Sequence, residues 1–219
     1  MTEPLSILST KILGEGISQK MRQAGWTLRE EEFILEKGLA LPPHEKPNDQ
    51  TVIVYTSAHA IQPLAGNIAC LSGNTRGHLP ADAEIACTAA NATDLAHAIL
   101  KDGRFTKALF FCAKEHRPEL PDILRQAGLT VHEIPVYETI ATPHTIDTPF
   151  DAVLFFSPSG VDSFFTHNRV PPGAIAFAIG ETTAARAREH KDTQVISSPS
   201  PTQEALLHCI QTYYESTEK

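Results

Sequence analysis

Short turns rich in serine, threonine and glycine are the residues of this chain best suited to bind a charged ligand. Three of them follow apolar runs and precede helical patterns, at residues 157–160, 180–183 and 197–203. Helix amino termini carry unpaired N–H groups and a partial positive charge, so such turns favour anions. The candidate binding residues, including two from the first half, are Thr56, Ser57, Ser157, Ser159, Gly160, Thr182, Thr183, Ser200 and Thr202.

Each turn taken singly also has a purely structural interpretation. Serine and threonine are preferred helix N-caps whatever the function. The segment Ser200-Pro201-x-Gln203 has the form of a capping box with proline at the first helical position. The hypothesis of a site therefore depends on the number of these turns and on their expected position at one edge of a parallel sheet, where ligands bind.

Strands alternating with helices must place these turns. The sequence predicts strands at 5–10, 26–35, 52–55, 68–71, 84–87, 107–111, 130–136, 152–156, 174–179 and 194–197. It predicts helices at 18–24, 93–100, 119–127, 161–167, 183–189 and 203–213, the first ended by Gly25 in a left-handed cap. This alternation is typical of an α/β fold with mostly parallel sheets covered on both faces.

The chain also nearly repeats itself, in three segments displaced by about 100 residues, the length of a small domain. Residues 22–27 return at 125–130, 51–57 at 151–157, and 68–75 at 175–182. We therefore expect two related α/β halves that could face each other across a cleft. The predicted domains are residues 1–35 plus 142–219, which is discontinuous, and residues 38–137, with a proline loop at 142–148.

Composition excludes several classes of function. The formal net charge is −8 and no basic run exceeds a pair, so neither nucleic acid nor a membrane surface is an expected partner. The 4 cysteines and 10 histidines lack metal-ligand spacing, so we expect no metal site and no disulfide framework. No apolar stretch approaches the roughly 20 residues of a membrane span, and the amino terminus lacks the pattern of a signal sequence. These features predict a soluble cytoplasmic protein.

Tyr137 is a candidate of a different kind, because it ends an apolar strand just before the proline loop. A tyrosine there is either an interdomain packing residue or a hydrogen-bond donor that presents its hydroxyl to the cleft. The sequence leaves both possibilities open.

At four segments the chain resembles the uroporphyrinogen-III synthases of tetrapyrrole biosynthesis. The matching segments are Val136-Tyr137-Glu138-Thr139, residues 155–161, residues 178–184 and residues 198–206. The resemblance implies two flavodoxin-like α/β domains with parallel sheets, joined by a two-stranded linker, with a deep cleft between them and no cofactor. It implies hydroxymethylbilane as substrate, a linear tetrapyrrole with many carboxylates. The enzyme would close this chain with loss of water and inversion of the last pyrrole ring.

The resemblance also implies roles for individual residues. Tyr137 matches the family's functionally important tyrosine and would assist departure of hydroxide; it is the predicted catalytic residue. Thr183 or its neighbour Thr182 matches the family's important threonine, and Ser157 and Ser159 match serines near the substrate. The chain departs from the family pattern at Lys11, where an arginine is usual, and at Glu181, which adds a negative charge beside a proposed anion site.

Two other classes remain as alternatives to a monomeric synthase. One is a non-catalytic two-lobed module that binds an anion or a tetrapyrrole, for example in regulation. Because the chain has no basic patch, such a module would not be a regulator that binds DNA by itself. The other is a generic flavodoxin-like or receiver-type protein. A receiver needs clustered acidic residues at its strand ends, where this chain carries hydroxyls.

Overall fold

The structure is a computed structural model that describes residues 4–217, and the chain forms two compact units. Unit 1 comprises Met1–Leu35 and Ile140–Lys219, and unit 2 comprises Glu36–Thr139. The chain passes between the units twice, within β3 (Ile34–Gly38) and within β8 (Thr130–Ala141). Among the described residues, no helix is long and apolar enough to cross a membrane.

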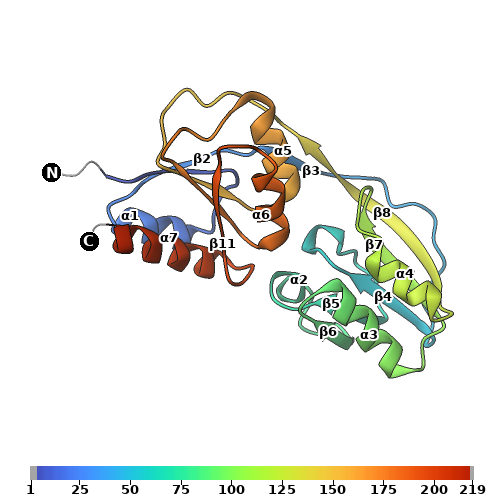
Figure 1. Cartoon of the computed structure of the whole chain (residues 1–219). Coiled ribbons are helices and arrows are strands. Elements are labelled where there is room, and N and C mark those ends of the chain that lie inside the picture. The colour runs from blue at the N-terminus through green and yellow to red at the C-terminus, as the bar shows by residue number, and fades with distance from the viewer. Residues whose placement is uncertain (1–3, 218–219) are drawn as a thin grey trace. The chain divides into compact units, whose positions relative to one another are not determined.

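Unit 1 contains a five-stranded sheet in the order β11-β10-β9-β1-β2, in which neighbouring strands pair in parallel (Figure 1). Its strands are β1 (Ser6–Ser9), β2 (Thr27–Glu30), β9 (Ala152–Phe155), β10 (Ile175–Ala178) and β11 (Gln194–Ser197). The helices are α1 (Glu15–Gln23), α5 (Pro158–His167), α6 (Glu181–Arg188) and α7 (Gln203–Thr217). Helices α1 and α7 pack on one apolar face of the sheet, whereas α5 and α6 pack on the other.

Unit 2 contains a six-stranded sheet in the order β3-β8-β7-β4-β5-β6. Its other strands are β4 (Thr51–Tyr55), β5 (Asn67–Leu71), β6 (Ile85–Ala89) and β7 (Lys107–Ala113). Helices α3 (Ala92–Asp102) and α4 (Glu119–Gln126) cover one face. The opposite face is covered in part by the single-turn 3-10 helix η1 (Ala58–Ala60), while the four-residue helix α2 (Asn74–Gly77) follows β5. The predicted α/β class with parallel sheets is confirmed in both units.

The sequence repeats mark equivalent positions in the two sheets. Both α1 and α4 are followed by a C-cap alanine and then by a left-handed glycine, Gly25 with φ 81° and Gly128 with φ 93°, and each leads into a strand. Strands β4 and β5 occupy the places in unit 2 that β9 and β10 occupy in unit 1. Strands β1 and β2 occupy the places of β7 and β8, the last two parallel strands of unit 2. Unit 1 therefore has the same strand arrangement as unit 2, but its chain order is circularly permuted.

Several predicted boundaries are wrong. The single strand expected at 26–35 is two strands, β2 and β3, which belong to different sheets. Four of the five β3 residues are exposed, so the apolar pattern could not mark this strand. Strand β8 runs on from the predicted end at Val136 to Ala141, and α1 begins three residues before the predicted Ser18.

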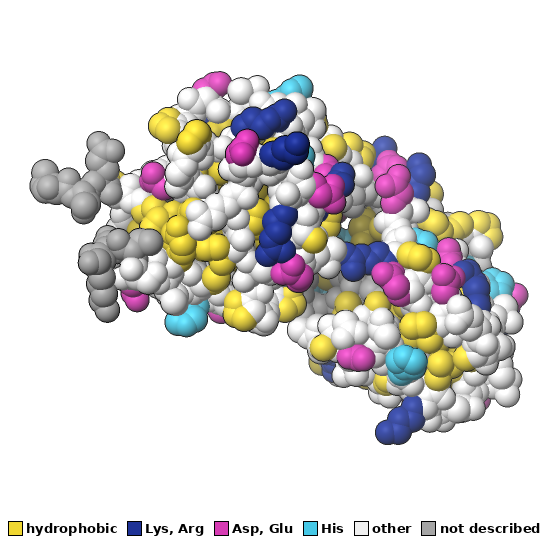
Figure 2. All heavy atoms as spheres, in the orientation of Figure 1, with side chains coloured by type: hydrophobic (Ala, Val, Ile, Leu, Met, Phe, Trp, Pro, Cys, Tyr) yellow, Lys and Arg dark blue, Asp and Glu magenta, His cyan; other side chains and the backbone are white. Residues whose placement is uncertain are grey.

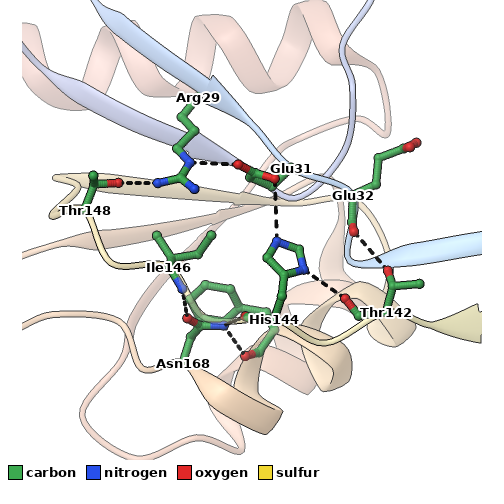
Figure 3. Close-up of polar contacts among 9 residues, drawn as sticks. Arg29, Glu31, Glu32, Thr142, His144, Ile146, Thr148 and Asn168 are labelled. Atoms are coloured by element: carbon green, nitrogen blue, oxygen red, sulfur yellow. Dashed lines mark hydrogen bonds and ion pairs between the residues drawn. The ribbon is translucent and has the colours of Figure 1, made fainter.

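The predicted proline loop after β8 is held in unit 1 by a polar cluster around His144 (Figure 3). The imidazole stacks on Phe33 with ring centroids 4.2 Å apart, and its Nδ1 lies 2.9 Å from the Thr142 carbonyl oxygen. Asn168 donates through Nδ2 to the His144 carbonyl oxygen at 2.8 Å and accepts from the Ile146 N–H at 2.8 Å. These bonds satisfy backbone groups that a loop would otherwise leave unpaired.

Candidate functional site

In unit 1, the predicted binding turns lie at the carboxyl edge of one sheet. Ser157 follows β9, Thr182 and Thr183 follow β10, and Ser200 and Thr202 follow β11. Backbone hydrogen bonds join neighbouring strand ends: the Ile179 N–H donates to Phe155 at 2.9 Å, and the Ser198 N–H donates to Ala178 at 2.8 Å. The order of strands reverses between β9 and β1, and such switch points are where doubly wound sheets bind ligands.

The turn after β9 is packed against the end of β1. Ser157 caps α5, because its Oγ accepts from the Gly160 N–H at 3.1 Å. A Cβ on Gly160 would lie 3.3 Å from Ser157 Oγ and 3.8 Å from Thr10 Oγ1, so this close approach favours glycine. Thr10, which the sequence analysis did not single out, donates to the Leu154 carbonyl oxygen at 2.7 Å. Ser159 is exposed in the first turn of α5.

The cap predicts a measurable effect on stability. We expect Ser157→Ala to lower the free energy of unfolding by about 1 kcal/mol, because the Gly160 N–H loses its acceptor. Denaturant unfolding of the two proteins measures this difference. The matched control is Ser159→Ala, which removes an exposed hydroxyl and should change stability by less than about 0.5 kcal/mol. Equal stability of the two variants would contradict the capping role.

The turns before α6 and α7 are organised differently from the prediction. Thr183 is buried with 4% of its surface exposed, whereas Thr182 is exposed. The capping box assigned to Ser200 and Gln203 is wrong: Thr202 Oγ1 accepts from the Ala205 N–H at 3.2 Å, and Gln203 Oε1 accepts from the Gly14 N–H at 3.1 Å. Ser200 is exposed and uses its carbonyl oxygen to accept from Ser198 Oγ.

Glu181, the charge that departs from the family pattern, is exposed and forms an ion pair with Arg188 on the same helix. This hydrogen-bonded pairing lowers the pKa of the Glu181 carboxyl. The Arg188 guanidinium therefore offsets part of the negative charge that Glu181 places at the start of α6.

In unit 2, a β-bulge directs Tyr137. The β7–β8 register pairs Cys112 with Pro135 and Ala113 with Tyr137, so one extra β8 residue, Val136, is inserted. Proline has no N–H to donate to a ladder and is found in sheets at bulges. As a result, the Tyr137 ring packs against the same apolar cluster as its neighbour Val136, on the face of η1. Pro135 was the sequence signal that could have predicted this bulge.

The Tyr137 phenol lies at the carboxyl edge of the unit 2 sheet with two other predicted residues. Ser57 follows β4 and caps η1, accepting from the His59 N–H at 3.3 Å, and Thr56 is half-buried beside it in sequence. Burial raises the pKa of the half-buried Tyr137, while a side-chain hydrogen bond with Ser57 opposes the shift. The phenol therefore stays protonated at neutral pH and can donate its proton.

The sequence analysis missed two sets of charged residues on the strands that adjoin Tyr137, of which the first lies beside its ring. His59 Nε2 lies 2.9 Å from Glu36 Oε2, and the His59 and Tyr137 ring centroids are 5.8 Å apart. Glu138 lies between two lysines, with Lys37 Nζ at 3.5 Å and Lys114 Nζ at 3.6 Å from its two oxygens. These pairs join residues far apart in sequence, so no local pattern could have indicated them.

The structure thus brings together two sets of predicted residues, one in each unit. Their convergence on a single cleft stays a prediction. Lys, Arg, Asp and Glu side chains are interspersed on the face that Figure 2 shows, rather than gathered in a basic patch. Within the described chain, no group of three or more His, Cys, Asp or Glu residues is placed to hold a metal ion.

The chain is therefore a two-unit α/β protein. Its two doubly wound units are joined through β3 and β8, and hydroxyl-rich turns follow their strands. The sequence model described as "Uroporphyrinogen-III synthase HemD" matches residues 81–208. The chain therefore belongs to the uroporphyrinogen-III synthase family, as the resemblance predicted.

Solved structures agree in fold. The chain is similar to the uroporphyrinogen-III synthetase of Helicobacter pylori 26695, with a TM-score of 0.67 and 17% identity over 95% of this chain and 99% of that one. It is also similar to a mutant uroporphyrinogen III synthase of the extremely thermophilic bacterium Thermus thermophilus, with a TM-score of 0.54 and 14% identity over 98% and 99% of the two chains. No match was found among curated protein sequences.

Proposed function

We propose that this chain closes hydroxymethylbilane into uroporphyrinogen III, with loss of water and inversion of the last pyrrole ring. Membership of the uroporphyrinogen-III synthase family supports a haem-biosynthesis enzyme of this kind. The observation that carries the assignment of residues is the half-buried Tyr137 phenol, which lies with Thr56 and Ser57 at the carboxyl edge of the unit 2 sheet and whose pKa is raised by burial.

In this proposal Tyr137 is the general acid. Its O–H bond breaks as the proton passes to the terminal hydroxyl of the substrate, and the C–O bond breaks with its electron pair leaving in water. The substituted carbon of the last pyrrole ring attacks the methylene carbon freed in this way, and its older bond to the neighbouring bridge carbon then breaks. That bridge carbon bonds to the unsubstituted carbon of the same ring, which loses its proton and restores the phenol. Because the reaction is a dehydration with no net oxidation or reduction, we expect it to need no cofactor.

The remaining predicted residues would hold the substrate's carboxylates. Thr56 and Ser57 in unit 2, and the α5, α6 and α7 turns in unit 1, offer hydroxyls and backbone N–H groups. Each helix amino terminus contributes about 0.3–1 kcal/mol to a nearby carboxylate, so several are needed. Lys37 and Lys114 are exposed, and their nitrogens lie 3.5 Å and 3.6 Å from the Glu138 oxygens. Such loose pairs contribute little, and both lysines can therefore turn to a substrate carboxylate.

Holding the substrate is as important as the proton transfer. Hydroxymethylbilane also closes without an enzyme, to the uninverted isomer, so the protein must favour attack by the substituted carbon. We propose that residues 1–35 plus 142–219 and residues 38–137 act as two domains that enclose the substrate between them. We further propose that the enzyme works as a monomer in the cytoplasm.

A coupled assay tests the function directly. Purified protein receives hydroxymethylbilane, and the two macrocycle isomers are separated and quantified over time. We expect the inverted isomer to dominate and to form faster than spontaneous closure. If only the uninverted isomer appears, at the spontaneous rate, the proposal fails. Saturable binding of the bilane without turnover would instead indicate the non-catalytic tetrapyrrole-binding module.

A further inference from the structure

A carboxylate–imidazole pair lies beside Tyr137 in unit 2. Glu36 in β3 accepts from His59 in η1, with 2.9 Å between Oε2 and Nε2. The His59 ring is tilted by 44° to the Tyr137 ring at 5.8 Å, and the His59 backbone N–H donates to Ser57 Oγ at 3.3 Å. Ser57 in turn lowers the pKa of the Tyr137 phenol through its side chain. His59 therefore links the Glu36 carboxylate to both Ser57 and the Tyr137 ring.

The contribution of this pair to folding does not explain its arrangement. The side chains of Glu36 and His59 are 34% and 47% exposed. An ion pair this exposed stabilises a fold very little. However, a carboxylate bound to one ring nitrogen fixes the orientation and tautomer of an imidazole. By fixing the His59 imidazole, Glu36 therefore also orders the short segment 57–59, which carries Ser57 and contacts the Tyr137 ring.

We propose that His59, held by Glu36, is a positioning residue for the ring closure and keeps the Tyr137 phenol directed at the departing hydroxyl of the substrate. This inference depends on the proposed role of Tyr137. Displacing a reacting group by about 1 Å can cost up to 10²-fold in rate, so even a half-exposed contact of this kind can control turnover.

Glu36 also acts on Tyr137 through its charge. Burial is the main cause that raises the pKa of the phenol, and the charge of the Glu36 carboxylate raises it further, followed by that of a thiolate at Cys112. The titratable groups near the phenol on its own face of the sheet are Glu36 from β3 and His59 from η1, whereas Cys112 from β7 packs on the opposite face. Removing the Glu36 charge lowers the pKa of the Tyr137 phenol, so the phenol loses its proton, and with it its ability to act as an acid, at a lower pH. Removing His59 leaves the Glu36 charge in place, and His59 is not among the causes of the phenol shift, so we expect the phenol pKa to stay where it is.

The test compares Glu36→Gln and His59→Gln with two matched controls. Glu84→Gln removes an exposed carboxylate elsewhere in unit 2. His97→Gln removes an exposed histidine of α3 that lies in the same Ala-His-Ala context as His59. We expect both test variants to lose roughly tenfold in kcat with similar KM, and the controls to match wild type. Thermal melting of all four variants checks that folding is unchanged.

Two readouts separate positioning from a general structural effect. The first readout is pH dependence: the alkaline limb of the kcat profile should move to lower pH in Glu36→Gln but not in His59→Gln. The spectroscopic titration of Tyr137, obtained by difference from Tyr137→Phe, should move in the same way. In a Tyr137→Phe background, His59→Gln should cause no further loss, because it acts through the phenol.

Wild-type-like kcat in both test variants, an unmoved limb in Glu36→Gln, or an additive loss in the double variant would overturn the inference. Those outcomes require an active wild type, whereas an inactive wild type would instead contradict the proposed function.

Discussion

Tyr137→Phe should lower kcat for formation of the inverted macrocycle by roughly 10²- to 10⁴-fold, the range typical of a lost general acid. The variant keeps the ring that packs on the η1 face and loses only its half-buried hydroxyl. The free energy of unfolding should therefore fall by no more than about 1 kcal/mol. Substrate affinity should change little, because the carboxylate contacts are unaffected. Single-turnover kinetics with isomer separation, together with denaturant unfolding, measure both quantities.

The matched control removes a tyrosine hydroxyl far from the carboxyl edge of either sheet. Tyr214 donates to the Asp151 carbonyl oxygen at 3.0 Å, at the amino end of β9. Tyr214→Phe should keep wild-type kcat while showing a comparable change in stability. If Tyr137→Phe retained wild-type turnover as well, the phenol could not be the acid, and Tyr137 would be a packing residue, the other role that its sequence position left open.

The local chemistry of this chain made much of the fold predictable. Strand β4 is buried on both faces, with Val52 and Val54 packing on one side and Ile53 and Tyr55 on the other, which gives a continuous apolar run. Helix α3 is bounded by an Asn91 cap and by Gly103 in the left-handed region, both evident as residue types. Such elements are determined within a few residues, so composition and periodicity suffice.

The wrong or missing elements depend on partners distant in sequence. Strand β3 is a strand because it pairs with β8: the Leu39 N–H donates to Val136 and the Thr142 N–H donates to Phe33. Its own side chains are mostly exposed and carry no pattern. The same holds for the site, where the hydroxyl turns were visible but the pairing of Glu36 with His59 was not. A charge pair between a strand and a distant 3-10 helix is determined by topology, which residue types alone do not give.

Phe164→Ala should cause the largest loss of stability, about 3–5 kcal/mol, out of the roughly 5–15 kcal/mol typical of a whole domain. Phe164 is fully buried on α5. Its ring lies 5.3 Å from Phe33, 6.3 Å from Phe150, 5.3 Å from Phe155 and 5.1 Å from Phe165, measured between centroids. Removing it opens a cavity among these rings, and edge-to-face contacts are lost in addition to buried area.

The sole tryptophan reports this effect, because Trp26 lies in unit 1 and packs against its core. The midpoint of fluorescence-detected denaturant unfolding should fall strongly for Phe164→Ala and much less for Phe164→Leu, which refills most of the cavity. An unmoved midpoint in Phe164→Ala would contradict the central place of this ring. Because α5 begins at the turn that carries Ser157, Ser159 and Gly160, the alanine variant should also bind substrate more weakly. Core packing in unit 1 and the geometry of its binding edge therefore depend on the same helix.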